Sequence, residues 1–444
     1  MEIPDGLAQA LNFGLVDAVL SRRSRRFGLG MSLPEGALAH TSSAPPIPLG
    51  ELEEAFLVWL GTGATGLALG DLPRHGLEWM HAWGGRSWPC SCNSHSTELF
   101  YTNDSGLYLV RPEDAPDPGG IAPFAGRTPE ETLDLVLKLF RASSRRIEDG
   151  RADLPDGEPG LFRFNAWNAN RPGTTLFIPV TNTTIEYMTL LFIYFDEAHR
   201  FSVVDEHSGN ARCGLDRWLA AGRLGRDVEL SLIDLELRVL TTLNVEQAFI
   251  SQNMSLAMQA LGLGGWTFTG FLPHHVLGAS PAHRGLGFDI VTPARTPRHV
   301  AAAVPVGRAG VMEGLCPPYV ASMDEAVDRF LAMRASSPGQ PTPYNEPAEV
   351  MTERGGYSEE TIEIVKAFCT YVHETHGRFP AFVDPMFVRL VLQAHHLELP
   401  FYDRHYREGA YASTHRDHFR LWHPDRAAEV DAREKLEEIS DTIS

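Results

Sequence analysis

Four arginines surround one serine near the N-terminus, in the run Arg22-Arg23-Ser24-Arg25-Arg26. Guanidinium groups are planar donors that match phosphate oxygens and the carbonyl edge of a flat heterocycle. The chain carries a formal net charge of −19, so this concentration of positive charge stands out. The plain alternative is an exposed basic turn at a helix end, where arginine suits the helix dipole. The functional interpretation is a site for a phosphorylated, planar cofactor.

A second segment with chemical interest lies some 240 residues later. A predicted helix carries Asn253 and ends in Leu261-Gly-Leu-Gly-Gly-Trp266, and Thr269 and Gly270 follow. Glycines at the C-terminus of a helix are ordinary caps. Two or three together also let a flat ligand approach the backbone closely. On that interpretation Gly265, Thr269 and Gly270 become candidate ligand contacts, and the Gly270 amide could point at a ring nitrogen.

A third segment, Pro89 to His95, is a predicted loop rich in hydroxyl and amide groups. Ser91 and Asn93 could bind a sugar-like chain or a ring carbonyl. The structural alternative is a turn in which Ser and Asn bond their own backbone. The spacing Cys90-x-Cys92-xx-His95 could also suit zinc, but no partner Cys pair appears elsewhere, so we predict no metal ligands.

The order and spacing of these segments resemble the FMN-dependent nitroreductase family. That family reads Arg-Arg-Ser-x-Arg, then a loop like Pro-Ser-Ser-x-Asn-Ser-Gln-Pro before a strand. A helix bearing Asn and ending Ala-Leu-Gly-Leu-Gly-Ser follows. A Gly-Phe dipeptide and a strand like Gly-Tyr-Pro close the pattern, the last resembled here by Gly285-Leu-Gly-Phe288. The resemblance covers roughly residues 14–115 and 180–300.

The resemblance implies an α+β fold, with a central mixed or antiparallel sheet flanked by helices, and a homodimer with FMN at its interface. It implies that the arginine segment holds phosphate and the pyrimidine edge, that the loop flanks the ring, and that an amide meets flavin N5. The implied contacts are Arg22, Arg23, Ser24, Arg26, Ser91, Asn93, Gly265, Thr269, Gly270 and Arg298.

This chain departs from the family pattern at several positions. Cys90 stands where Ser is usual, Ser96 where Pro is usual, and Thr269 where some members have Glu. The downstream basic residue for phosphate could be Arg284 or Arg295 as well as Arg298.

The stretch Arg86-Ser-Trp-Pro89, with Gly106–Val110, resembles a subgroup of azoline-oxidising dehydrogenases that act on peptide natural products. The implied activity is hydride transfer through flavin N5, to or from a small organic or peptide-derived substrate. NAD(P)H or that substrate would donate the hydride. In such enzymes the cofactor performs the chemistry, and the sequence identifies no catalytic residue.

Composition limits the alternatives. A sequence pI near 5.4 argues against nucleic-acid or anionic-membrane partners, which need a basic surface. Five cysteines in a long chain indicate a reducing compartment. The N-terminus lacks the features of a signal peptide, and the most apolar run, Tyr187 to Phe195, is too short to span a bilayer. We therefore expect a cytoplasmic protein.

Apolar spacing and capping residues predict the elements that hold these segments. Helices are expected within 5–29, 52–60 and 245–261, and from Thr128, Ser322, Ser358 and Asp384 onward, with a charged helical tail over 425–443. Strands are expected at 97–110, as a hairpin, and at 176–180 and 201–204. We divide the chain into an FMN-binding core, 1–305, with an insertion at about 116–180, and a C-terminal helical extension, 306–444, that could form a lid or dimer arm.

Histidines concentrate near the C-terminus, and the simplest expectation for them is an ordinary surface or interface. After residue 370 they are His373, His376, His395, His396, His405, His415, His418 and His423. They leave open a metal-dependent hydrolase as one alternative to the flavoenzyme. Another is a non-redox binding or partner module on the same fold. Tyr402, Tyr406 and Tyr411 could line a lid over the flavin.

Overall fold

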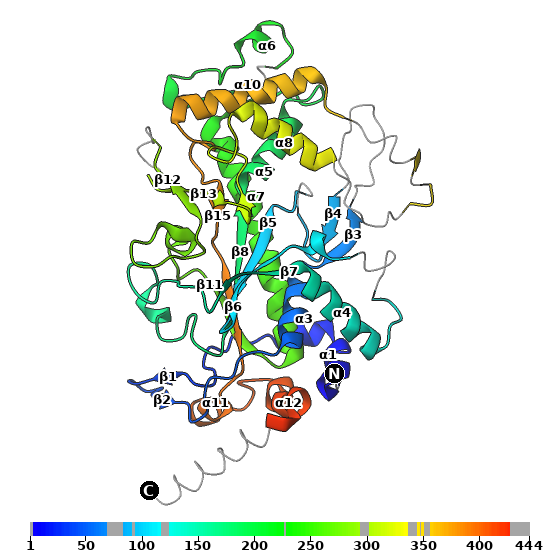
Figure 1. The fold of residues 1–444 in the computed structure, drawn as a ribbon, viewed down its shortest axis with the longest axis vertical. Coiled ribbons are helices and arrows are strands. Elements are labelled where there is room, and N and C mark those ends of the chain that lie inside the picture. The colour runs from blue at the N-terminus through cyan, green and yellow to red at the C-terminus, as the bar shows by residue number, and fades with distance from the viewer. Residues whose placement is uncertain are drawn as a thin grey trace, which may run out of the picture.

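The computed structural model describes residues 3–68, 83–90, 94–116, 124–225, 228–293, 302–335, 344–346, 348–349 and 356–426. A seven-stranded sheet occupies its centre (Figure 1). The strand order is β11 (Gly264–Phe268), β16 (Val391–His395), β8 (Thr175–Asn182), β5 (Thr97–Thr102), β6 (Gly106–Val110) and β7 (Ser144–Asp149), and β15 (Met386–Phe387) also pairs with β8. All of these pairs are antiparallel, which confirms the expected α+β class with a central antiparallel sheet.

Both faces of the sheet are buried because successive side chains point to opposite faces and apolar residues occupy both sets of positions. Leu99 and Tyr101 of β5 belong to one apolar cluster, and Phe100 between them belongs to another. The first cluster lies under α3 (Glu51–Thr62), α4 (Pro129–Ser143) and α7 (Leu232–Leu261). The second is closed by irregular segments around Leu161, Phe271 and Phe288.

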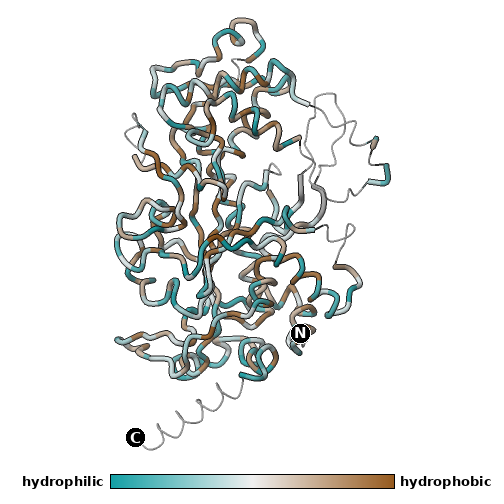
Figure 2. The backbone as a smooth tube through the Cα atoms, viewed as in Figure 1, coloured by the Kyte–Doolittle hydropathy of each residue, from teal (hydrophilic) through white to brown (hydrophobic). Residues whose placement is uncertain are grey.

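A further layer packs against the N-terminal half of α7. It contains α5 (Thr183–Tyr194), α6 (Asp216–Ala220), α8 (Met323–Ala335) and α10 (Glu359–His376). Figure 2 shows apolar segments, in brown, running through the middle of the molecule. The apolar run 187–195, which is the end of α5 and its C-cap Phe195, contributes to the core of this layer.

The remaining elements are short and lie mostly around the sheet edges. The helices are α1 (Asp5–Leu11), α2 (Leu15–Leu20), α11 (Leu399–His405) and α12 (Ser413–Trp422). The strands are β1 (Ser32–Leu33), β2 (His40–Thr41), β3 (Ala64–Ala68), β4 (Trp83–Arg86), β9 (Ser202–Val204), β10 (Glu229–Ser231), β12 (Asp289–Val291), β13 (Val304–Arg308) and β14 (Met312–Glu313).

Local capping signals gave correct helix starts. The Thr128 side chain accepts from the Glu131 N–H and the Glu131 side chain accepts from the Thr128 N–H, which forms the capping box that opens α4. Ser358 caps α10 by accepting from the Thr361 N–H, without the reciprocal bond. Helix α3 and the hairpin β5–β6 also lie where the sequence predicts them.

Other expectations were wrong or too coarse. The helix expected from Asp384 is instead strands β15 and β16, whose residues Val391–His395 are buried on both faces. Gly285 to Phe288 forms a turn, since Gly285 and Gly287 have φ of 62° and 70°, and β12 begins only at Asp289. The pattern within 5–29 divides into α1 and α2, and α7 begins well before residue 245.

The sheet draws strands from all parts of the chain. β8 lies in the range predicted as an insertion, yet it pairs with β5, β15 and β16. β16 lies in the range predicted as a helical extension, yet it separates β11 from β8. The expected tail helix lies almost entirely outside the described residues. In the described residues, none of the helices combines the length and apolar character needed to cross a bilayer.

Candidate functional site

The arginine segment and the end of α7 lie side by side. The Arg25 N–H donates to the Gly265 carbonyl over 3.1 Å, and the Gly265 N–H donates to the Arg25 carbonyl over 2.8 Å. The Gln259 side chain accepts from the Arg23 N–H at 2.8 Å and donates to the Arg23 carbonyl at 3.2 Å. The two segments therefore pair directly, and no ring can lie between their backbones.

Side chains alternate along this extended segment, so the arginines divide into two groups. Arg25 is half-buried, with its guanidinium 5.8 Å and 5.6 Å from the ring centroids of Tyr402 and Tyr406. Its Nε donates to the Ala410 carbonyl. Arg23, also half-buried, donates to the Ser21 carbonyl over 2.8 Å. Arg25 thus attaches the segment to the fold, and Arg23 Nε adds a contact of 3.4 Å with the Gly409 carbonyl.

Arg22, Ser24 and Arg26 are exposed and together form what we call the arginine surface. Arg22 Nη1 donates to Ser24 Oγ at 3.1 Å, and the Arg26 guanidinium lies 5.5 Å from the Trp266 ring centroid. In the part of the chain that the structure describes, neither arginine has an acidic partner. The surface therefore presents positive charge and hydrogen-bond donors to solvent.

The glycines after α7 serve packing. A Cβ on Gly265 would lie 2.1 Å from the Gln393 carbonyl oxygen of the neighbouring strand, at a φ of 154°. A Cβ on Gly270 would lie 2.2 Å from Asn165 Nδ2. Neighbouring segments of the protein already fill the space that a Cβ would take at Gly265 or Gly270. The close approach that requires glycine is therefore made by the protein and not by a ligand. Thr269, by contrast, is exposed.

Three predicted contacts, Ser91, Asn93 and Arg298, lie outside the described residues. The residues that flank the loop are fixed on α7. Asn253 Nδ2 donates to the Ser87 carbonyl at 2.9 Å, and the Cys90 thiol donates to Glu246 Oε1 at 2.9 Å. Burial raises the pKa of Glu246 to about 7, although hydrogen bonds from Cys90 and Thr97 oppose this shift. The role of Asn253 is thus to hold the loop.

The loop and the arginine segment contact different sides of α7. Glu246 and Asn253 are seven residues apart and share one side, whereas Gln259 is rotated from Asn253 by about 120°. The segments that the sequence pattern groups together thus meet on one helix, but on separate faces.

Helix α2 precedes the arginine surface and exposes apolar side chains. Leu15, Val16 and Leu20 have exposed fractions of 71%, 68% and 78%. Large apolar side chains gathered in this way mark interaction surfaces more often than free surface. This apolar face, which we call the α2 face, ends two residues before Arg22.

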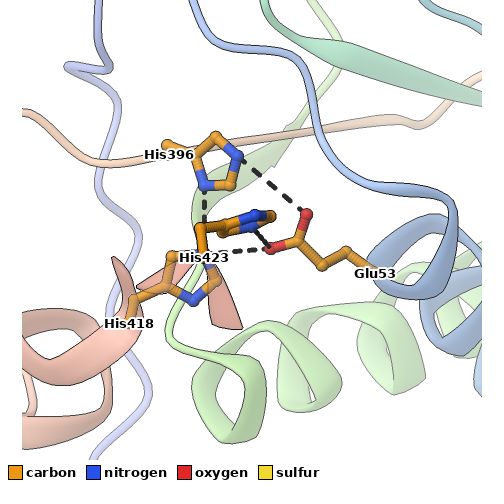
Figure 3. A group of neighbouring side chains, drawn as sticks. All are labelled: Glu53, His396, His418 and His423. Carbon is orange, nitrogen blue, oxygen red and sulfur yellow. Dashed lines mark hydrogen bonds and ion pairs between the residues drawn. The ribbon is translucent and has the colours of Figure 1, made fainter. Parts of the chain in front are cut away.

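A second candidate site joins Glu53 with three histidines from the C-terminal part of the chain (Figure 3). Glu53 is in the first turn of α3, His396 follows β16, His418 is in α12, and His423 caps that helix. Their side chains converge, with Glu53 Oε1 2.9 Å from His418 Nε2 and 3.0 Å from His423 Nε2. We call this group the Glu53 site.

Outer hydrogen bonds fix the orientation of these groups. His418 Nδ1 lies 2.7 Å from the Leu261 carbonyl, and His396 Nε2 lies 3.3 Å from the Pro48 carbonyl. The Gly50 N–H donates to Glu53 Oε2 over 2.5 Å. The inner ring atoms, His418 Nε2 and His396 Nδ1, are then 3.1 Å apart.

Electrostatics favour an ionised Glu53 beside a neutral His396. Burial raises the pKa of Glu53, but His396, His418 and His423 outweigh it and hold that pKa well below its usual value. Burial lowers the pKa of His396 to about 3, against the opposing effect of Glu53. A carboxylate and a neutral imidazole are the forms that bind metal ions.

Sequence reasoning noted the three histidines but did not select them, and it missed Glu53. An acid in the first turn of a helix is explained by the helix dipole, so Glu53 gave no separate signal. The pair His373-xx-His376 is a different feature, because His376 lies 2.8 Å from Asp205 Oδ2 in another part of the fold. Only the tertiary structure shows that His376 and the three histidines near Glu53 lie in different parts of the fold.

Comparisons with known proteins add little. No family model matches the chain, and no curated protein matches it. Among solved structures, the chain is similar to a "putative nitroreductase" from Ralstonia eutropha JMP134, at 12% sequence identity and a TM-score of 0.27. The match covers 59% of this chain and 73% of that one. A likeness at this TM-score supports neither a family nor a function.

Proposed function

We propose that the protein is an FMN-dependent oxidoreductase in which the arginine surface binds the phosphate-bearing end of the cofactor. The observation that carries the proposal is the exposed set Arg22, Ser24 and Arg26 in a chain with a net charge of −19. Two guanidinium groups without an acidic partner in the described residues suit an anionic ligand such as FMN, whose phosphate accepts several charge-assisted hydrogen bonds.

The residues of this chain fit such a group in part. Arg22 and Ser24 are already hydrogen-bonded to each other, so both donors can reach one phosphate oxygen. Arg26 places a positive charge beside Trp266, where it would stabilise an anionic reduced ring. FMN supplies hydride transfer at N5, to or from a small organic or peptide-derived substrate, with NAD(P)H as one hydride donor. Gly265 and Gly270 are packed by the protein and are not part of the proposal.

The second part of the proposal is a homodimer that covers the α2 face. Burying Leu15, Val16 and Leu20 would gain roughly 1.5–3 kcal/mol for each side chain that becomes fully buried. A second copy placed there would also reach the adjacent arginine surface. This arrangement explains how an exposed phosphate site could become enclosed, although the loop and the arginine segment lie on different sides of α7 in one chain.

The test is the absorbance spectrum of the purified full chain, with the released cofactor identified by mass. We expect a yellow protein that releases FMN, or a colourless protein that binds added FMN with quenched flavin fluorescence. A colourless protein that leaves the fluorescence of added FMN unchanged contradicts the proposal. That result would favour the non-redox binding module.

A further inference from the structure

We propose that the Glu53 site binds one transition-metal ion, with Zn²⁺ as the best match, and that this ion has a structural role. The four ligand atoms are Glu53 Oε1, His396 Nδ1, His418 Nε2 and His423 Nε2 (Figure 3). The inference does not depend on the flavin, because the arginine surface contributes none of these residues.

Three of the six separations between the ligand atoms are close to those of tetrahedral coordination, and all four atoms lie within 4.8 Å of one another. Zn–N and Zn–O bonds of about 2.0–2.1 Å give ligand-to-ligand separations of about 3.3 Å. In the structure, Glu53 Oε1 is 2.9 Å from His418 Nε2 and 3.0 Å from His423 Nε2, and His396 Nδ1 is 3.1 Å from His418 Nε2. Each separation needs to open by only a few tenths of an ångström.

The outer hydrogen bonds determine which ring nitrogens face inward. A carbonyl only accepts, so His418 must donate from Nδ1 to Leu261, and His396 must donate from Nε2 to Pro48. A neutral ring then directs a lone pair inward from its other nitrogen. Metal-bound histidines show this pattern, with the outer N–H held by a carbonyl or carboxylate.

Without a cation, the inner arrangement is unfavourable. Two imidazole lone pairs, on His396 Nδ1 and His418 Nε2, would face each other at 3.1 Å. The His418 lone pair would also face a carboxylate oxygen at 2.9 Å. The rival explanation is a buried imidazolium at His418 that shares one proton between these two acceptors. A metal ion satisfies all four atoms at once.

The ligand set indicates the metal class and its role. Imidazole with one carboxylate suits zinc better than calcium or magnesium, which prefer oxygen ligands. Four protein ligands fill a tetrahedral shell, and closed sites of this kind are structural. Glu53, His396 and His418 are almost fully buried, whereas His423 is 20% exposed and provides the access route.

The consequence is a link between distant parts of the chain. The ion would join the start of α3, the segment after β16 and helix α12. The same helix is bonded to the end of α7, where Thr414 Oγ1 donates to the Gln259 carbonyl at 2.8 Å. Loss of the ion should therefore loosen the C-terminal segment.

The decisive measurement is made on the full chain without an affinity tag. We expect about one zinc per chain by elemental analysis. A strong chelator should lower Tm, and added Zn²⁺ should restore it. Cobalt added to the chelated protein should give the intense visible absorption of a tetrahedral nitrogen–oxygen site. Chelated protein that takes up neither Zn²⁺ nor Co²⁺, and whose Tm is unchanged, overturns the proposal in favour of the imidazolium network.

Variants locate the ion. His423→Asn changes the most exposed ligand, so the chain should still fold while its zinc affinity falls at least about tenfold. Glu53→Gln keeps the shape but removes the anion, and should have the same effect. The matched control is His415→Asn, a buried histidine on the same helix outside the site, which should keep wild-type zinc content. Full zinc binding in both ligand variants places the ion elsewhere and refutes the assignment.

Discussion

The Glu53 site and the arginine surface differ in how complete they are within one chain. The first is largely buried, and one ligand atom from each of its four side chains already lies within 4.8 Å of the others. The second is exposed, and its donors point to solvent beside the uncovered α2 face. A closed site can be assigned from one chain because the types and positions of its donor atoms indicate which ligand fits. An open surface identifies only the charge of its partner.

The same contrast occurs between two neighbouring residues of α3. Glu53 and Glu54 are both buried. The histidines around Glu53 hold its pKa well below the usual value, whereas burial raises the pKa of Glu54 to about 7 against the opposing hydrogen bonds from Asn103 and Thr175. Adjacent acids thus have opposite protonation preferences because their side chains face different neighbours.

The largest expected effect separates these two acids. Glu53→Gln should lower the free energy of unfolding by about 3–5 kcal/mol, the cost of removing one partner from a buried charged group. Glu54→Gln should change it by less than about 1.5 kcal/mol, because Gln can still accept from Asn103 and Thr175. Urea unfolding at about pH 7 measures both. Equal losses in the two variants would remove the distinction.

The pH dependence of stability sharpens the comparison. In the folded protein Glu54 keeps its proton up to about pH 7, whereas the unfolded chain releases it near its ordinary value of 4.5. The folded state binds more protons between these values, so stability falls as pH rises from 4.5 to 7. For Glu54 the loss is at most about 3–4 kcal/mol.

Glu54→Gln should therefore make that decline shallower in urea titrations across this range. The rest of the decline of stability with pH should remain in the variant, because burial also raises the pKa values of Glu98, Glu236 and Glu246 to about 7. An unchanged slope in the variant would show that Glu54 is ionised throughout.

The arginine surface should show the opposite profile, with a binding defect and little loss of stability. Arg22→Ala and Arg26→Ala should each weaken FMN binding by about 1.5–3 kcal/mol, the range for charged hydrogen bonds. Fluorescence titration measures the affinity. Arg238→Ala, exposed on α7 about 30 Å along the helix from Gln259, is the control and should bind as wild type. Wild-type FMN affinity in both test variants would show that the flavin does not bind to this surface.

The smallest effect concerns the α2 face. If a second copy covers it, Leu20→Lys should weaken the dimer by about 1.5 kcal/mol through lost apolar burial. Sedimentation velocity over a concentration series measures the change. Leu38→Lys replaces an exposed leucine at the β1–β2 turn and should leave the assembly unchanged. A chain that is monomeric before any substitution argues against the dimer.

Features with a local cause were readable from the sequence. The capping residues Thr128 and Ser358 start helices because they bond backbone groups only three residues away. The order of the segments related the arginine segment to the end of α7 only through a shared ligand, whereas in the structure their backbones pair directly. The role of the glycines was not readable, since Gly265 is needed where Gln393 approaches from a strand more than 120 residues away.

The strand at 391–395 shows why other expectations failed. Val391 to His395 is buried on both faces, so it lacks the alternation that marks a strand exposed on one side. Its conformation depends on the open edges of β8 and β11, which no local pattern reports. Ser91, Asn93 and Arg298 remain predictions, because they lie outside the described residues.

By itself, the sequence determined the acidic balance, the starts of several helices, the β5–β6 hairpin and the arginine cluster, all of which follow from composition or from neighbours a few residues apart. Only the tertiary structure decided that Glu53 meets three histidines more than 340 residues away, and that two of the arginines face inward. The physical reason is that burial and pairing set the charge and orientation of a side chain, and both depend on segments that folding brings together.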